Sequence, residues 1–269
     1  MKTLTTLFRT LVAGLLLAAS SAVLAGDCPR IVSQSPYLSA ALDWLGRGHC
    51  IVGVSRYDTL DLPRTGGVKD PDVDAIELLA PDLLVASEGT DAAALQDALP
   101  AGARLLRVNG FASLADAEAM LAELGHASGV PDVDARVAAF RRDWQAAAAR
   151  VGGKGRRVLV LSACSAMPYS FGRAHFVGDV FAHAGFELVE SAPRIRHIRP
   201  GEEYEDLLTA VDRLQPDVVF SLDRTDAQQC NALLGLLPVP VIHLVGENFF
   251  QPGARVLAGL AELADKAGR

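Results

Sequence analysis

One stretch in the middle of the chain constrains the fold more than any other. Between positions 131 and 151, apolar residues recur every three or four positions, the spacing that places side chains on one face of a helix. The recurring residues are Val133, Val137, Phe140, Trp144, Ala148 and Val151. A proline at position 131 suits a first helical turn, and the glycine-rich residues 152–155 end the pattern. The sequence therefore predicts one unbroken amphipathic helix about 30 Å long.

Short apolar segments alternate with helical segments on both sides of this helix. Strands are expected at residues 30–33, 51–55, 83–86 and 104–108 before it, and at 157–162, 187–190, 217–221 and 239–244 after it. Helices are expected at residues 36–45, 74–79, 92–99, 113–125, 177–184, 204–214, 227–236 and 252–266. Strands that are separated by helices favour parallel sheets.

The two halves also share a local motif. APDLLV at residues 80–85 and QPDVVF at 215–220 each combine a helix end, a proline and a buried strand. The sequence thus predicts an α/β fold of two lobes, each with a central parallel sheet flanked by helices, joined by a single long backbone helix. The expected boundaries are an N-terminal lobe at 26–130, the linking helix at 131–152 and a C-terminal lobe at 153–269. A single rigid connection predicts a cleft between the lobes that opens only slightly.

Residues 1–25 have the pattern of an export signal. Two basic residues precede an apolar run at 11–19, and Val23 and Ala25 occupy the −3 and −1 positions of a small-residue cleavage site. The apolar run is too short to span a membrane comfortably. The alternatives are an uncleaved anchor and a lipid-modified Cys28, which the acidic residue before it disfavours. We expect cleavage after Ala25 and a mature protein in the periplasm, where disulfides can form.

The four cysteines add a further constraint. Cys28 and Cys50 each stand at the start of an apolar strand, and neighbouring parallel strands would bring these starts together. A Cys28–Cys50 disulfide is therefore expected, with Cys164 and Cys230 as the second pair; the alternative for that pair is buried free thiols. Four scattered cysteines are too few for a zinc ribbon or an iron–sulfur cluster.

Candidate binding residues follow the expected strands, because open parallel sheets bind ligands beyond the carboxyl ends of their strands. These residues combine aromatic rings with arginines, which suits a bulky, flat or chelated ligand with anionic edges. The set is Tyr37, Arg56, Tyr57, Glu88, Tyr169, Arg173, His175, Arg196, His197, Arg199, Arg224 and Phe249. Arg194 lies in the same basic cluster at 194–199, whose alternative role is that of a solvated loop.

Signatures of catalysis are missing from the sequence. It holds neither a Gly-x-Ser-x-Gly elbow nor a Walker loop, and its six histidines include no pair spaced for zinc on a helix. A net charge of −7 disfavours binding to the phosphates of a nucleic acid. We expect no enzyme, no intrinsic cofactor and no metal held by the protein itself. The alternative is an exported redox or metal-binding enzyme that uses Cys164, Met167 and His175.

The order and spacing of several motifs resemble those of the periplasmic substrate-binding proteins of ABC importers for cobalamin, ferric siderophores and haem. The most specific stretch is GGVKDPDVDAI at 66–76, followed by PDLLVA at 81–86. Further motifs are RIVSQSP at 30–36, IVGVSRY at 51–57, PYSFG at 168–172, FVGD at 176–179, AG at 184–185 and PGAR at 252–255. The resemblance covers nearly the whole mature chain and implies two lobes joined by a backbone helix.

The resemblance also implies a function and its partners. A monomer would hold a metal chelate or tetrapyrrole between its lobes and deliver it to an inner-membrane ABC permease, and any metal would arrive inside that ligand. Members of the family dock through one acidic residue on each lobe. The matching residues here are Asp74 and, within EEYE at 202–205, Glu205. The alternative is a sensor or scavenger that works without a transporter.

The resemblance constrains the ligand through two comparisons. Haem-binding members tend to carry a tyrosine after the glycine that matches Gly67, where this chain has Val68. Cobalamin-binding members line the cleft with tryptophans, whereas Trp44 and Trp144 are expected in the core. The arginine content favours an anionic ferric chelate.

Overall fold

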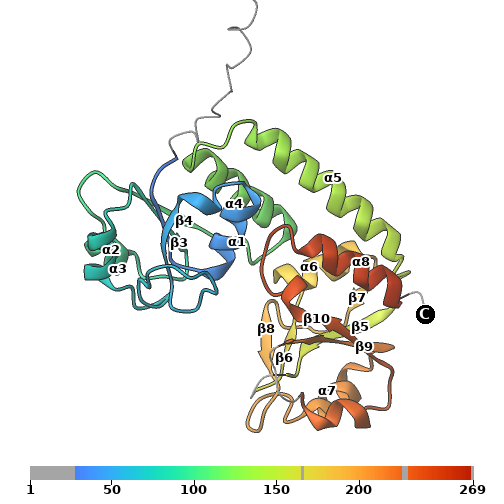
Figure 1. The fold of residues 1–269 in the computed structure, drawn as a ribbon. Helices are drawn as coiled ribbons and strands as arrows, with labels where there is room; N and C mark the ends of the chain where they lie inside the picture. The colour runs from blue at the N-terminus through green and yellow to red at the C-terminus, as the bar shows by residue number, and fades with distance from the viewer. Residues whose placement is uncertain (1–27, 165–166, 226–229, 268–269) are drawn as a thin grey trace, which may run out of the picture.

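The computed structural model describes residues 28–164, 167–225 and 230–267, so the expected export signal lies outside the described residues. Two α/β lobes are joined by a long helix, α5 (Val133–Val151), which runs along the outside of both (Figure 1). The helix predicted at 131–152 is therefore present as one unbroken element. No helix in the described ranges is both long enough and apolar enough to cross a membrane.

The first lobe is built on a four-stranded parallel sheet with the order β2-β1-β3-β4. Its strands are β1 (Ile31–Ser33), β2 (Ile51–Val54), β3 (Leu83–Ser87) and β4 (Arg104–Val108). Its helices are α1 (Pro36–Trp44), the short 3-10 helix η1 (Gly48–Cys50), α2 (Val73–Leu79), α3 (Ala92–Asp97) and α4 (Leu114–Ala127). Alternate residues of the strands pack against α1 and α4 on one face and against α2 and α3 on the other.

The second lobe is built on a mixed sheet with the order β10-β9-β5-β6-β8, and β7 also pairs with β5. Its strands are β5 (Arg157–Ser162), β6 (Tyr169–Phe171), β7 (Glu187–Leu188), β8 (Ile195–His197), β9 (Val218–Asp223) and β10 (Val241–Val245). Its helices are α6 (Phe176–His183), α7 (Leu207–Leu214), the 3-10 helices η2 (Ala232–Leu236) and η3 (Gly246–Asn248), and α8 (Val256–Ala267).

The predicted fold class is confirmed, with one correction in the second sheet. β5, β7, β9 and β10 pair in parallel as expected, whereas β6 and β8 form an antiparallel extension, so this sheet is not wholly parallel. These two strands have three residues each, too few to show a periodic pattern in the sequence. Within the described part of the predicted helix at 227–236, the chain forms only the 3-10 helix η2.

An apolar core runs without a break from one lobe to the other along α5. One cluster of buried residues includes Leu121 of α4, Phe140 and Ala148 of α5, Phe181 of α6 and Leu260 of α8. Two smaller clusters cover the outer faces of the sheets, under α2 and α3 in the first lobe and under α7 in the second. Because α5 buries one face against both lobes, the lobes share a core instead of meeting at a flexible linker.

Trp144 shows how α5 holds the helices of both lobes. Its indole Nε1–H donates a hydrogen bond of 2.7 Å to Oε1 of Glu118, a buried carboxylate on α4. Its ring packs edge-on against His183 of α6, with 4.9 Å between the ring centroids. Trp144 is therefore a core residue, as predicted, whereas Trp44 is partly buried and packs edge-on against Phe140 at the margin of the core.

The motif that the two halves share in sequence has the same structure in both lobes. α2 and α7 each end at a residue in the left-handed conformation, Ala80 with φ 43° and Gln215 with φ 48°. The aspartate two residues later accepts a backbone hydrogen bond at the start of β1 in the first lobe and of β5 in the second. These helices occupy corresponding places at the far ends of the two lobes (Figure 1).

Both predicted disulfides are present. Cys28–Cys50 joins the chain ahead of β1 to the start of β2. Cys164–Cys230 joins the chain after β5 to the segment ahead of η2. The sequence argument for the first pair holds because β1 and β2 are parallel neighbours whose starts lie together.

Two hydrogen bonds join the lobes beside α5. The backbone N–H of Phe176 donates to the carbonyl oxygen of Phe111 at 2.7 Å, and the N–H of Leu114 donates to Oδ2 of Asp179 at 2.8 Å. Leu114 is the first residue of α4, whose amide has no partner within its own helix. A carboxylate on the second lobe therefore caps a helix of the first.

Replacing Asp179 with alanine tests this contact between the lobes. We expect D179A to unfold in urea with about 1 kcal/mol less stability, because an amide of α4 loses its acceptor. Hydrogen exchange at Leu114 should become faster. D179N keeps an oxygen acceptor and serves as the matched control, so equal behaviour of D179A and the wild type would contradict the role assigned to this carboxylate.

Candidate functional site

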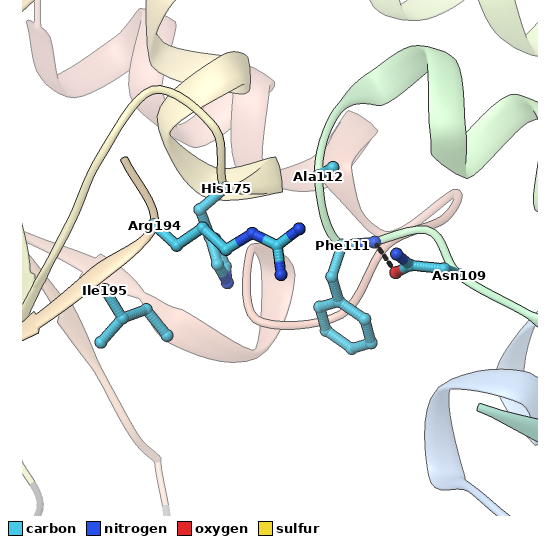
Figure 2. Close-up of a pocket in the computed structure, with 6 residues that line it drawn as sticks. All are labelled: Asn109, Phe111, Ala112, His175, Arg194 and Ile195. Carbon is cyan, nitrogen blue, oxygen red and sulfur yellow. Dashed lines mark hydrogen bonds between the residues drawn. The ribbon is translucent and has the colours of Figure 1, made fainter. Parts of the chain in front are cut away.

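A pocket of about 330 Å³ lies between the lobes. Asn109, Phe111 and Ala112 line it from the first lobe, and His175, Arg194 and Ile195 line it from the second. Figure 2 shows these side chains converging from the two lobes, with the Arg194 guanidinium directed towards Phe111 and the His175 ring beside it. We call these six residues the cleft group.

The first-lobe wall begins where β4 ends. Oδ1 of Asn109 accepts a hydrogen bond of 3.0 Å from the backbone N–H of Phe111, a local turn that sets the direction of the Phe111 side chain. The Phe111 ring packs edge-on against Tyr37 at a centroid distance of 4.8 Å. Tyr37 is buried behind it and donates its hydroxyl to the carbonyl oxygen of Val108 at 3.4 Å. Tyr37 thus supports the wall from behind.

The second-lobe wall is set by the start of α6. His175 is the N-cap of this helix, and its Nδ1 accepts a hydrogen bond of 3.1 Å from the backbone N–H of Val177. Histidine is not among the residues that helices prefer as N-caps, which are Ser, Thr, Asp and Asn. The ring also packs against Phe171, with 4.9 Å between centroids, and it faces Phe111 across the cleft at 6.4 Å.

Close backbone packing holds the two second-lobe loops together. The N–H of Gly172 donates to the carbonyl oxygen of Arg194, and the N–H of Ala174 donates to that of Pro193, each at 2.6 Å. A Cβ on Gly172 would overlap the carbonyl oxygen of Ala192. Glycine is therefore required at position 172 for the loop that carries His175 to approach the loop that carries Arg194.

The electrostatics of the pocket follow from burial. Burial, together with the nearby positive charge of Arg194, lowers the pKa of His175 from 6.5 to about 4, so the imidazole is neutral at physiological pH. Burial also raises the pKa of Tyr37, and the Glu88 carboxylate adds to that effect. Both rings are therefore held in their uncharged forms.

No carboxylate lines this pocket among the described residues. The guanidinium of Arg194 is exposed and has no ion-pair partner in the described part of the chain. Arg173 is exposed on the loop that carries His175. The pocket thus combines apolar ring surface with an uncompensated positive charge.

The antiparallel ribbon of β6 and β8 extends the second-lobe wall. Tyr169 pairs with His197 and Phe171 pairs with Ile195, so these four side chains share the face on which the cleft group lies. The rings of Tyr169 and His197 are 6.2 Å apart. Both predicted residues therefore lie on the cleft side of the ribbon.

Arg196 is predicted to contact the ligand, but the pleat of β8 places its side chain on the face opposite Tyr169 and His197. Its Nε donates to Oε1 of the buried Glu190 at 2.9 Å, and its Nη1 pairs with Glu203. Ser170, the partner of Arg196 in the ribbon, also donates to Glu190, at 2.5 Å. Arg196 therefore belongs to a polar network inside the second lobe.

Phe249 is also predicted to contact the ligand, but the structure places it in the core. Its side chain is fully buried and packs against Phe181 and the backbone of α8 at Gly259. The residue after it, Phe250, is partly exposed and lies 6.5 Å from Phe171, measured between ring centroids.

Other predicted residues lie further from the pocket or already have partners. Arg56 and Tyr57 follow β2, which is three strands from β4, or about 14 Å at the usual strand spacing. Arg56 forms an ion pair of 2.5 Å with Asp70, and Arg199 pairs with Glu202 at 2.9 Å. The exposed Glu88 and Arg224 stand at the ends of β3 and β9.

The sequence argument missed Asn109, Phe111 and Ala112. They follow the fourth strand of the first lobe, and the rule that placed ligands beyond the ends of β1, β2 and β3 applies equally to β4. Arg194 was part of the basic cluster but was not selected. Arg194 precedes β8, and nothing in the sequence shows that its side chain lines the pocket while that of Arg196 does not.

The residues of the alternative enzyme are not brought together. Cys164 is bonded to Cys230, Met167 contacts Arg199, and His175 caps α6. Two groups of potential metal ligands occur among the described residues, Cys28 with His49 and Cys50, and Cys164 with Asp223 and Cys230. In both groups the cysteines form a disulfide, which removes the thiolates that would bind a metal.

The two expected docking acids are both exposed, but they are not equivalent in the repeated motif. Asp74 lies two residues after Asp72, the N-cap of α2, whereas Glu205 lies one residue before Asp206, the N-cap of α7. The residue two positions after Asp206 is Leu208, which is exposed. Neighbouring Glu202 and Glu203 are already engaged in ion pairs with arginines of the same lobe.

The lowered pKa of His175 predicts an acid-dependent stability. The unfolded chain takes up a proton near pH 6.5, whereas the folded chain does so only near pH 4, so folding loses stability as the pH falls between these values. We expect this contribution to be of the order of 3 kcal/mol. Urea unfolding of the wild type and of H175N, in which an asparagine oxygen can still cap α6, should show a smaller acid-induced loss in the variant. If the two proteins lose the same stability between pH 6.5 and pH 4, the assignment of this effect to His175 is wrong.

Comparison with known proteins agrees with the two-lobed fold. The model of the periplasmic binding protein family matches residues 34–229. The periplasmic vitamin B12 binding protein of Vibrio cholerae has a TM-score of 0.71 at 19% identity, over 90% of this chain and 97% of that chain. Periplasmic haem-binding proteins from Roseiflexus sp. RS-1 and Pseudomonas aeruginosa reach the same TM-score at 21% and 23% identity. Those matches cover 90% and 88% of this chain and 100% and 91% of theirs.

A comparison with curated protein sequences finds no match. The family model nevertheless spans most of the chain, and the solved structures share its two-lobed architecture. The chain belongs to the periplasmic binding protein family.

Proposed function

We propose that this protein is an exported receptor that binds a metal chelate or tetrapyrrole between its lobes and delivers it to an inner-membrane ABC importer. The observation that carries the proposal is the cleft group, in which Phe111 of one lobe faces His175 and Arg194 of the other. A ligand held there would touch both lobes. Its binding would stabilise their relative position.

The chemistry of the cleft suits a flat or chelated ligand. Aromatic rings offer broad apolar faces, and arginines bind anionic edges. The pocket is largely formed in the structure, so a ligand would be bound without a large rearrangement. Vitamin B12-binding and haem-binding proteins have similar folds, which supports this class of ligand.

Binding without a reaction is part of the proposal. The family and the similar structures are binding proteins, and the cleft group contains no nucleophile paired with a base. Any metal is expected to arrive as part of the ligand.

Purification from the native host tests the ligand class directly. We expect the protein to retain a chromophore or a stoichiometric metal, measured by absorbance spectroscopy and elemental analysis. A corrinoid, a haem and a ferric chelate have different spectra. Protein that is colourless and metal-free, and that binds none of these compounds when they are added, would contradict the proposal.

Replacing Phe111 with alanine tests the site. The variant loses an aromatic face against the ligand, and we expect its affinity for the purified ligand to fall about tenfold in calorimetric titration. L236A removes an exposed apolar side chain of η2, outside the cleft group, and should bind like the wild type. Equal affinities of F111A and L236A would place the binding site elsewhere.

Delivery to a permease rests on the exposed acids at the far ends of the lobes. Asp74 is in the first turn of α2 and Glu205 precedes α7, so an arginine of a membrane partner could reach either carboxylate. Among the acids at 202–205, Glu205 has no ion pair within the described residues, which favours it over its neighbours. The surrounding side chains Leu78 and Leu208 are also exposed.

Charge reversal at these positions separates an importer receptor from a sensor or scavenger. We expect D74K and E205K to bind the ligand normally in vitro and to reduce its uptake by cells, because like charges would face each other at the docking surface. E123K, on the exposed side of α4, is the control for the change in net charge. If cells with the variant that carries both D74K and E205K take up the ligand normally, a receptor that works without a transporter is favoured.

A further inference from the structure

The orientation of the His175 ring determines which of its nitrogens is available to a ligand. A backbone N–H can only donate, so Nδ1 of His175 must accept the hydrogen bond from Val177 with its lone pair. A neutral imidazole has one proton on its two nitrogens, and this proton must therefore be on Nε2. The histidine is held as a hydrogen-bond donor.

A histidine in this state cannot coordinate a metal. Coordination requires a nitrogen lone pair, and the only one is engaged with the first turn of α6. Rotating the ring to free it would break the cap of the helix and the contact with Phe171. Tyr37, the buried tyrosine behind Phe111, has a raised pKa and keeps its phenolic proton.

Arg194 completes the arrangement. Its loop is tied to the His175 loop by the backbone bonds of Gly172 and Ala174. Its guanidinium enters the same pocket beside the imidazole (Figure 2). Two groups that can only donate hydrogen bonds, one of them charged, thus share a pocket whose described lining contains no acid.

We propose that His175 and Arg194 form an anion-binding corner that selects ligands with a carboxylate on their edge, with His175 binding that carboxylate through Nε2–H and not binding the metal. This inference rests on the proposed binding function and names the ligand class that the cleft accepts. A carboxylate has acceptor positions for both donors at once. An edge of neutral amides lacks the charge that Arg194 requires.

Two pairs of probes test the requirement for a carboxylate. Haemin carries two propionates that its dimethyl ester lacks, and ferric citrate carries carboxylates that a neutral ferric trihydroxamate lacks. We expect at least one acidic probe to bind, and to bind at least tenfold more tightly than its neutral partner, in equilibrium dialysis. If haemin binds, the affinity for metal-free protoporphyrin should lie within threefold of the affinity for haemin.

Two variants at position 175 test the roles of the two ring nitrogens separately. H175N can keep the oxygen that caps α6 but has no donor at the position of Nε2, and H175Q can place an amide donor there while losing the cap. We expect H175N to lower the affinity for the acidic probe at least tenfold and H175Q to retain it within threefold. Far-ultraviolet circular dichroism of both variants shows that the measured proteins are folded.

A variant that removes the charge of Arg194 tests its role. R194Q should lower the affinity for the acidic probe at least tenfold and leave that for the neutral probe unchanged. R142Q makes the same charge change at an exposed position on α5 and should bind like the wild type. The absorbance spectrum of bound haemin should be the same in the wild type and in H175Q, because His175 does not bind the iron.

The outcomes distinguish this inference from the proposed function. If acidic and neutral probes bind equally well, or if H175Q changes the haemin spectrum, the anion-binding corner is wrong while the cleft remains the binding site. If H175Q binds as weakly as H175N, the role of Nε2–H is wrong. If no probe binds at all, the corner is wrong, and the ligand class is decided by the material that is purified with the protein from its native host.

Discussion

The continuous apolar core along α5 is the constraint on which the rest of the structure depends. One face of this helix is buried against α4 of the first lobe and against α6 and α8 of the second, so separating the lobes would expose apolar surface on both sides. Trp144 and the cap from Asp179 to Leu114 add specific contacts across the same region. The relative position of the lobes is therefore part of the folded core, and the cleft is largely formed before a ligand arrives.

The polarity of the cleft follows from this fixed geometry. The pocket lies where the edge strands β4 and β8 bring their adjoining loops together, and the start of α6 turns a histidine into it. The burial that disfavours a charged imidazole also places the ring among aromatic neighbours. Arg194 avoids a large desolvation cost because its side chain stays exposed. A positive charge can therefore remain at the pocket without a protein carboxylate beside it.

Much of the fold could be predicted, and less of the site. Apolar periodicity identified α5 and the parallel strands, and the cysteines at strand starts identified the Cys28–Cys50 disulfide. The sequence did not indicate which candidate residues face the cleft, because that depends on the direction of each side chain. Arg196 and His197 are adjacent in sequence, yet the pleat of β8 directs one into the lobe and the other to the cleft. Phe249 and Phe250 are likewise adjacent, yet the first is fully buried and the second is partly exposed.

The sequence by itself determined the architecture: two α/β halves, an unbroken helix between them and the Cys28–Cys50 pair, because these depend on periodicity and on residue type along the chain. Only the tertiary structure decided which side chains meet between the lobes. Phe111 and His175 are far apart in sequence and belong to different lobes, and they face each other because α5 holds two separate sheets in one arrangement. The state of the His175 ring depends on a backbone amide two residues away and on the surrounding burial, which no local pattern encodes.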